Sequence, residues 1–195
     1  MYETLAMRLT EFFINKNIIK NEDRDIYAYG YEVLISQIVY IVIMLIISLF
    51  FGAVFESILF FIGFYLFRKI AGGYHASTYI KCHLIFAINQ LLFLLLLIFY
   101  PNKYIYIFIL VAAIITFVIT FICAPLDHPN KRFEPREFKR YKRLSRWFCV
   151  LLMLLVTAIC FLDKNNTSYF CFSVGTLSAS ISLMYAFIER RLCNE

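Results

Sequence analysis

Six long apolar runs, separated by short polar segments, dominate the hydrophobic pattern of the chain. They lie at residues 33–51, 54–67, 84–100, 104–122, 147–162 and 168–188. Most of them approach the ~20 residues that an α-helix, rising about 1.5 Å per residue, needs to cross ~30 Å of hydrocarbon. The pattern therefore predicts an all-α, polytopic membrane protein with six transmembrane helices.

The first two runs follow each other almost without a break, since only Gly52 and Glu56 interrupt the apolar stretch from residue 33 to residue 67. A single helix of that length would measure about 52 Å, which exceeds the bilayer core. We therefore expect a tight hairpin between Gly52 and Glu56.

Residues 1–30 form a polar, amphipathic N-terminal segment. Between residues 2 and 14 apolar side chains stand among charged ones, which predicts an amphipathic helix at the membrane surface. A helix packed on the protein's own core fits this pattern nearly as well. No internal repeat divides the chain, so residues 1–195 are expected to form a single membrane-embedded domain.

Composition supports a membrane protein, because 62% of the 195 residues are hydrophobic and only 16% are charged. The positions of the basic residues predict its orientation, since Lys and Arg are enriched in cytoplasmic segments. With six spans and a cytoplasmic N-terminus, 17 of the 19 Lys and Arg residues lie inside and only Lys103 and Lys164 lie outside. Both termini are then cytoplasmic, and the charge of +6 gives no reason to expect a nucleic-acid partner.

The largest segment outside the apolar runs is a basic cytoplasmic loop at residues 124–146. Between residues 131 and 146 it holds eight Lys or Arg residues and two Glu residues. Such a segment attracts acidic peptide or anionic membrane lipid, but the same charges would also serve only to fix the topology. The candidate contact residues are Lys139, Arg140, Lys142 and Arg143.

The stretch RKIAGGYHASTYIKCH, from Arg68 to His83, gathers reactive side chains between the second and third apolar runs. Its two glycines are expected to end the second helix, because glycine adopts left-handed conformations at low cost. Ser77 or Thr78 is a suitable N-cap for the third helix, which places Cys82 in or near the first turn.

Cys82 is the candidate nucleophile, since a helix N-terminus and nearby basic residues favour a thiolate. His75 is the candidate base, and later the acid that protonates a leaving amine. In a straight helix the two residues would be ~10.5 Å apart along the axis, so the chain must turn back after the glycines. His83 is a rival base, ranked second because adjacent helical residues diverge by about 100°. The same three residues also fit packing and headgroup positions without any chemistry.

At these residues the chain resembles the AgrB family, the membrane-embedded cysteine endopeptidases of Gram-positive quorum sensing and virulence regulation. The resemblance spans nearly the whole chain and rests on RKIAGGYHA followed by Cys82, on YGYE before the first span, and on CAPLDHPNKR. It implies that Cys82 and His75 are catalytic. The positions that match the supporting part of the pattern are Arg68, Gly72 and Gly73, and Glu32 falls where members carry a polar residue.

The resemblance also implies a substrate, a product and a location. A precursor peptide of the AgrD type would be cut on the C-terminal side of the future ring. A cysteine or serine side chain of the peptide would then attack the acyl-enzyme thioester, giving a thiolactone or a lactone. No cofactor is implied, and the active site would face the cytoplasm from the bacterial cell membrane.

Other interpretations of the same residues stay open. A metal-dependent membrane hydrolase would use His and Cys side chains at the cytoplasmic face, namely His75, Cys82, His83, Cys123, Asp127 and His128. A transporter would use the sparse polar residues within the spans. The small residues of the sixth run suit close helix packing, within one chain or in an expected homodimer. The candidates for a third catalytic residue are Asp127, Glu32, Gln37 and Asn89.

Overall fold

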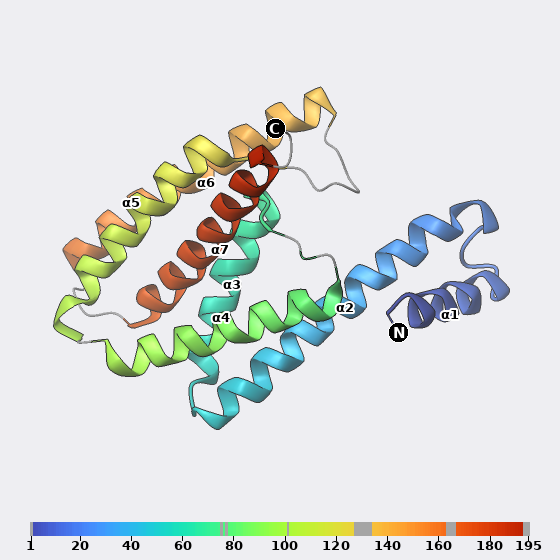
Figure 1. The fold of residues 1–195 in the computed structure, drawn as a ribbon, viewed down its shortest axis with the longest axis horizontal. Coiled ribbons are helices and arrows are strands. Elements are labelled where there is room, and N and C mark those ends of the chain that lie inside the picture. Colours follow the sequence, from blue (N-terminus) through green and yellow to red (C-terminus); the bar gives the residue numbers. More distant parts are fainter. Residues whose placement is uncertain are drawn as a thin grey trace.

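The computed structural model describes residues 2–74, 76, 78–100, 102–126, 134–162 and 167–192. Within these residues every regular element is helical (Figure 1). The α-helices are α1 (Tyr2–Asn15), α2 (Arg24–Phe50), α3 (Val54–Ala71), α4 (Tyr79–Phe99), α5 (Ile105–Cys123), α6 (Pro135–Leu162) and α7 (Thr167–Leu192). Short 3-10 helices, η1 (Asn21–Asp23) and η2 (Asn102–Tyr104), precede α2 and α5.

Each of the six apolar runs lies in one of the helices α2 to α7. The predicted hairpin between the first two runs is confirmed, since α2 ends at Phe50 and α3 begins at Val54. Gly52, in the turn between them, has a φ of +63°, a conformation that glycine reaches without steric cost. The predicted all-α fold is confirmed in the described part of the chain.

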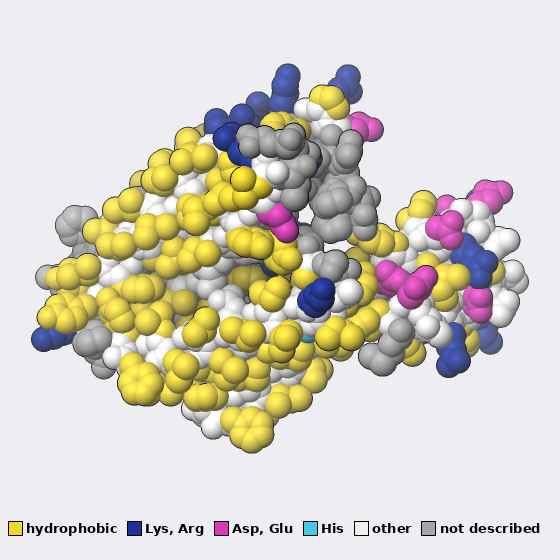
Figure 2. All heavy atoms as spheres, in the orientation of Figure 1, with side chains coloured by type: hydrophobic (Ala, Val, Ile, Leu, Met, Phe, Trp, Pro, Cys, Tyr) yellow, Lys and Arg dark blue, Asp and Glu magenta, His cyan; other side chains and the backbone are white. Residues whose placement is uncertain are grey.

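In the part of the chain that the structure describes, four helical segments are long and apolar enough to cross a membrane: Asn21–Phe50, Tyr79–Phe99, Ile105–Cys123 and Thr167–Leu192. Hydrophobic side chains also cover most of the visible face of the bundle (Figure 2). Such an extended apolar surface is unfavourable in water and suits contact with lipid. The chain is thus a multi-pass membrane protein, and the count of six spans stays a prediction.

The centre of the bundle is the contact between α3 and α7. Two glycines bring the helix backbones together there. A Cβ atom on Gly63 would lie 2.5 Å from the carbonyl oxygen of Phe172, and one on Gly175 would overlap the carbonyl of Phe60. The small residues of α7 therefore pack within the chain, and the homodimer stays a prediction.

Helix α1 lies beside the first half of α2, at one end of the molecule (Figure 1). Ala6 and Thr10 are buried in this contact, and Arg24 pairs with Glu11 at 2.7 Å. A helix thus forms where the sequence predicts one, and its position at a membrane surface stays a prediction. Residues 135–146 of the predicted basic loop form the first turns of α6.

The α3–α7 contact predicts a difference between two glycine-to-alanine variants. Gly175→Ala should destabilise the protein by about 1–3 kcal/mol, since the new methyl group meets backbone atoms that cannot rotate away. Gly30→Ala, within α2, is the control, because a Cβ there meets nothing within 4 Å. Thermal unfolding of both detergent-solubilised variants measures the effect. Equal melting temperatures would show that the two helices do not pack this closely.

Candidate active site

The segment after α3 begins with a bend that only glycine accommodates. Helix α3 ends at Ala71, and Gly72 has a φ of +89°. The N–H of Leu126, just after α5, donates to the carbonyl of Ala71 at 3.1 Å. A Cβ on Gly72 would overlap the carbonyl of Leu126, whereas one on Gly73 would meet a side-chain oxygen at 3.4 Å. The prediction that this glycine pair ends the helix is confirmed.

Tyr74, two residues after the bend, is held from both sides. The guanidinium of Arg68 donates a hydrogen bond to its carbonyl oxygen. Its N–H donates to the backbone oxygen and to the hydroxyl of Ser182 on α7, both at 3.2 Å. Its ring packs edge-on against Tyr185, with the ring centres 5.0 Å apart. These contacts fix the backbone immediately before His75, which itself lies outside the described residues.

Desolvation, followed by the negative charge of Glu189, raises the pKa of Tyr74 above its ordinary value. Smaller contributions in the same direction come from Tyr185 and Cys82. The Tyr74 phenol is therefore neutral at physiological pH, and it lies close enough to Cys82 to respond to the charge of the thiol.

The N-terminus of α4 positions Cys82. The hydroxyl oxygen of Thr78 accepts a hydrogen bond from the N–H of Lys81 at 3.3 Å, and the N–H of Cys82 donates to the carbonyl of Thr78 at 3.1 Å. Cys82 is therefore in the first turn of the helix, half-buried and not in a disulfide. The predicted cap at Thr78 and the predicted place of Cys82 are confirmed.

Tyr40 of α2 is a neighbour of Cys82 that the sequence analysis missed. Its hydroxyl lies close enough to the thiol for the two side chains to interact, and the charge of Arg68 also acts on it. Its ring is held by the rings of His83 and Phe86, at 4.4 Å and 5.1 Å between centres. Tyr40 is the single tyrosine in the first apolar run. Its hydroxyl, isolated among apolar side chains, could have indicated from the sequence that a polar partner lies nearby.

His83 is buried and has partners on both ring nitrogens. Its Nε2 lies 3.3 Å from the hydroxyl and from the backbone oxygen of Ser36, and its Nδ1 lies 3.4 Å from the Tyr2 hydroxyl. The ring also stacks on Tyr2, with centres 5.6 Å apart. These contacts join α1 and α2 to the N-terminal end of α4, which favours a structural role for the rival base.

The candidates for a third catalytic residue differ in their surroundings. Glu32 accepts a hydrogen bond from the hydroxyl of Tyr79 at 3.1 Å, which ties α2 to the start of α4. Asn89 lies about two turns beyond Cys82 and accepts from Ser178 at 3.0 Å. Asp127 is outside the described residues. Gln37 is half-buried on α2, three residues before Tyr40.

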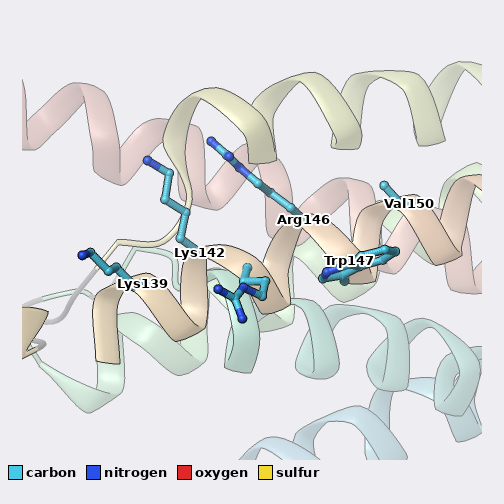
Figure 3. Close-up of a pocket in the computed structure, with 6 residues that line it drawn as sticks. Lys139, Lys142, Arg146, Trp147 and Val150 are labelled. Carbon is cyan, nitrogen blue, oxygen red and sulfur yellow. The ribbon is translucent and has the colours of Figure 1, made fainter. Parts of the chain in front are cut away.

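The basic residues predicted to bind substrate lie on α6, apart from the α2 and α4 residues that surround Cys82. Lys139, Arg140, Lys142 and Arg143 line open grooves whose described walls come from α6 (Figure 3). Among the described residues no three His, Cys, Asp or Glu side chains gather closely enough to hold a metal ion. Three members of the predicted metal set, His75, Asp127 and His128, lie outside those residues.

Two comparisons with known proteins, one with family profiles and one with individual sequences, indicate the same family. The profile of the family described as AgrB, accessory gene regulator B, matches residues 6–183. A Clostridium perfringens (strain SM101 / Type A) protein described as AgrB-like is 29% identical over 151 residues, covering 75% of this chain and 70% of its own. A second AgrB-like protein, from C. perfringens (strain 13 / Type A), is 28% identical over 174 residues, covering 87% and 81%. No solved structure matches the chain.

The bend predicts that the two adjacent glycines differ in their tolerance of substitution. Gly72→Ala should lower the melting temperature and change the alkylation rate of Cys82, because the added methyl group meets the Leu126 carbonyl in a left-handed conformation. Gly73→Ala is the matched control. Peptide mass spectrometry after brief treatment with a maleimide measures labelling at Cys82. If both variants behave alike, the bend is not formed by Gly72.

Proposed function

The chain belongs to the AgrB family, and from that premise we propose that it is a membrane-embedded cysteine endopeptidase that cleaves and cyclises a pheromone precursor. The family acts in peptide processing for agr quorum sensing, and its substrates are precursors of the AgrD type. The observation that supports the chemistry is the half-exposed Cys82 thiol, in the first turn of α4 beside Tyr40. We place this site and both termini on the cytoplasmic side, following the distribution of basic residues.

Cys82 is the proposed nucleophile and His75 the proposed general base and acid. Cys82 lies in the first turn of α4, where the cap at Thr78 fixes the backbone that carries it. Arg68 and Ser182 hold the backbone of residue 74, so they restrict where the next side chain, that of His75, can reach. We assign Arg68 and Ser182 as positioning residues for that histidine.

Cleavage proceeds through an acyl-enzyme in this proposal. His75 takes the proton of the Cys82 thiol, and the sulfur attacks the scissile carbonyl carbon. The C–N bond breaks as His75 returns the proton to the leaving amine, and a thioester to Cys82 remains. The hydrogen bond from Arg68 to the carbonyl of Tyr74 holds the backbone immediately before this histidine.

Cyclisation is the second half of the proposed reaction. A cysteine or serine side chain of the bound peptide attacks the thioester carbonyl, loses its proton to His75, and releases the sulfur of Cys82. Transfer of an acyl group between two thiols is nearly isoenergetic, whereas forming a thioester directly from an amide is uphill. The acyl-enzyme intermediate therefore separates the overall reaction into two steps. Water competes for the same carbonyl, and a recessed site that holds the peptide's own nucleophile close favours the ring.

Tyr40 supplies a hydrogen-bond donor to the sulfur in this scheme. Its ring is fixed between His83 and Phe86, so its hydroxyl has little freedom to turn away from Cys82. A donor that is held in place stabilises the thiolate when it forms and again when the thioester releases it. The contacts of its ring with His83 and Phe86 also hold α2 against the start of α4.

Loss of the nucleophile tests the peptidase proposal directly. Cys82→Ala should abolish both cleavage and cyclisation of a precursor in membrane vesicles, and His75→Ala should slow cleavage by about 10²–10⁴-fold. Cys123→Ala, at another cysteine, should cleave at the wild-type rate. Mass spectrometry of the peptide products measures all three. Undiminished cleavage by Cys82→Ala would refute the mechanism, and undiminished transport of a solute would favour a transporter.

The Tyr40 hydroxyl can be removed without removing its ring. Tyr40→Phe should lower kcat about 5–10-fold with little change in KM, since one hydrogen bond to the reacting sulfur is lost while the substrate contacts remain. Tyr106→Phe, on an exposed part of α5, is the control. Steady-state cleavage of the precursor by both variants, at equal melting temperature, gives the comparison. A rise in KM alone would assign Tyr40 to substrate binding instead.

A further inference from the structure

We propose that the basic end of α6 is a binding site for an anionic phospholipid. The phosphate lies among Lys139, Lys142, Arg143 and Arg146, and an acyl chain follows Trp147 and Val150 along the helix. The sequence leaves two ligands open for this segment, acidic peptide and anionic lipid. Three features of the structure favour the lipid.

The first feature is the composition of the groove, which changes along one helix face. Its described lining residues recur every three or four positions, so they share one side of α6. They are Lys139, Lys142, Arg143, Arg146, Trp147 and Val150. Figure 3 shows the basic side chains over the first turns, with Trp147 and Val150 further along. No carboxylate is among these residues, and Glu137 instead accepts a hydrogen bond from the N–H of Glu134 at 3.3 Å.

The second feature is the depth of the groove relative to α5, which is long and apolar enough to cross a membrane. The guanidinium of Arg146 lies over the ring of Phe121, 5.0 Å from its centre, and the thiol of Cys149 donates to Thr120 at 3.1 Å. Arg146 is therefore level with the last turn of α5. Lys142 follows about one turn, or ~5 Å, further out, which matches the ~5–8 Å thickness of a headgroup layer.

The third feature is an unsatisfied donor at this level. The Nε atom of Arg146 is buried and has no hydrogen-bond partner within the part of the chain that the structure describes. Buried donors in proteins normally have a partner, so this N–H indicates an acceptor that none of the described residues supplies. A phosphate oxygen is an anionic acceptor, and arginine binds it through more than one N–H.

The apolar half of the groove distinguishes a lipid from a soluble peptide. The side chain of Trp147 is 61% exposed, a value typical of the indole rings that gather at membrane interfaces. Beyond it Leu151 and Leu154 are each 60% exposed, so the apolar path continues along α6. An acidic peptide would use only the charged half, whereas a phospholipid has a part that fits each half.

Trp147 is the only tryptophan in the chain, so its fluorescence reports on this site alone. Full-length protein is reconstituted in phosphatidylcholine bilayers that contain a brominated lipid as quencher. At equal mole fractions, brominated phosphatidylglycerol should quench Trp147 more strongly than brominated phosphatidylcholine. The preference should fall as ionic strength rises, because the attraction is electrostatic.

Neutralising variants connect the preference to the groove. In the double variant Lys142→Gln, Arg146→Gln the relative affinity for phosphatidylglycerol should fall at least about fivefold. Lys103→Gln, before α5, is the matched charge control and should keep the wild-type preference. Quenching by brominated phosphatidylcholine should be the same in all variants, which establishes that α6 remains inserted.

Two results would overturn the proposal. One is equal quenching by the two brominated lipids in the wild-type protein. The other is relief of the phosphatidylglycerol quenching by a soluble polyglutamate peptide at low excess, which would assign the groove to acidic peptide. Because the measurement uses no precursor and no peptidase activity, its failure would leave the proposed function untouched.

Discussion

The arrangement of the site depends on one constraint, which is that a backbone leaving a helix at the edge of a bilayer must find new hydrogen-bond partners. Between α3 and α4 the chain satisfies it with three contacts from different elements. The carbonyl of Ala71 accepts from Leu126, and Tyr74 is bound by Arg68 on one side and by Ser182 on the other. Ala71 and Tyr74 are thus hydrogen-bonded to α3, to α7 and to the segment after α5, and this fixed backbone leads directly to position 75 in the sequence.

Cys82 and His83, adjacent at the start of α4, have different surroundings because a helix separates adjacent side chains by about 100°. Cys82 faces Tyr40 and the loop, whereas His83 is buried against Ser36 and Tyr2. His83, the rival candidate base, therefore joins α1 and α2 to the helix that carries Cys82. Helix α1 therefore contacts the start of α4 through Tyr2 and His83.

Local signals in the sequence predicted the features that short stretches determine. The hairpin at Gly52, the end of α3 at Gly72, the cap at Thr78 and the helical position of Cys82 each depend on a few neighbouring residues. Contacts across long separations were not predictable in this way. Tyr40 approaches Cys82, and Ser182 binds Tyr74, because α2 and α7 pack where they do. The basic segment formed the first turns of α6, since charge alone does not prevent helix formation from Pro135. The catalytic role of His75 stays a prediction, because the residue lies outside the described part of the chain.

The end of α5 contacts both the basic end of α6 and the bend after α3. Its last turn carries Phe121 under the guanidinium of Arg146, and the segment that follows it places Leu126 against the bend at Gly72. The basic groove and the catalytic loop thus share one short piece of backbone, although they use different side chains. A phosphate bound at Arg146 would hold α6 against α5, and so fix the element on which Gly72 rests.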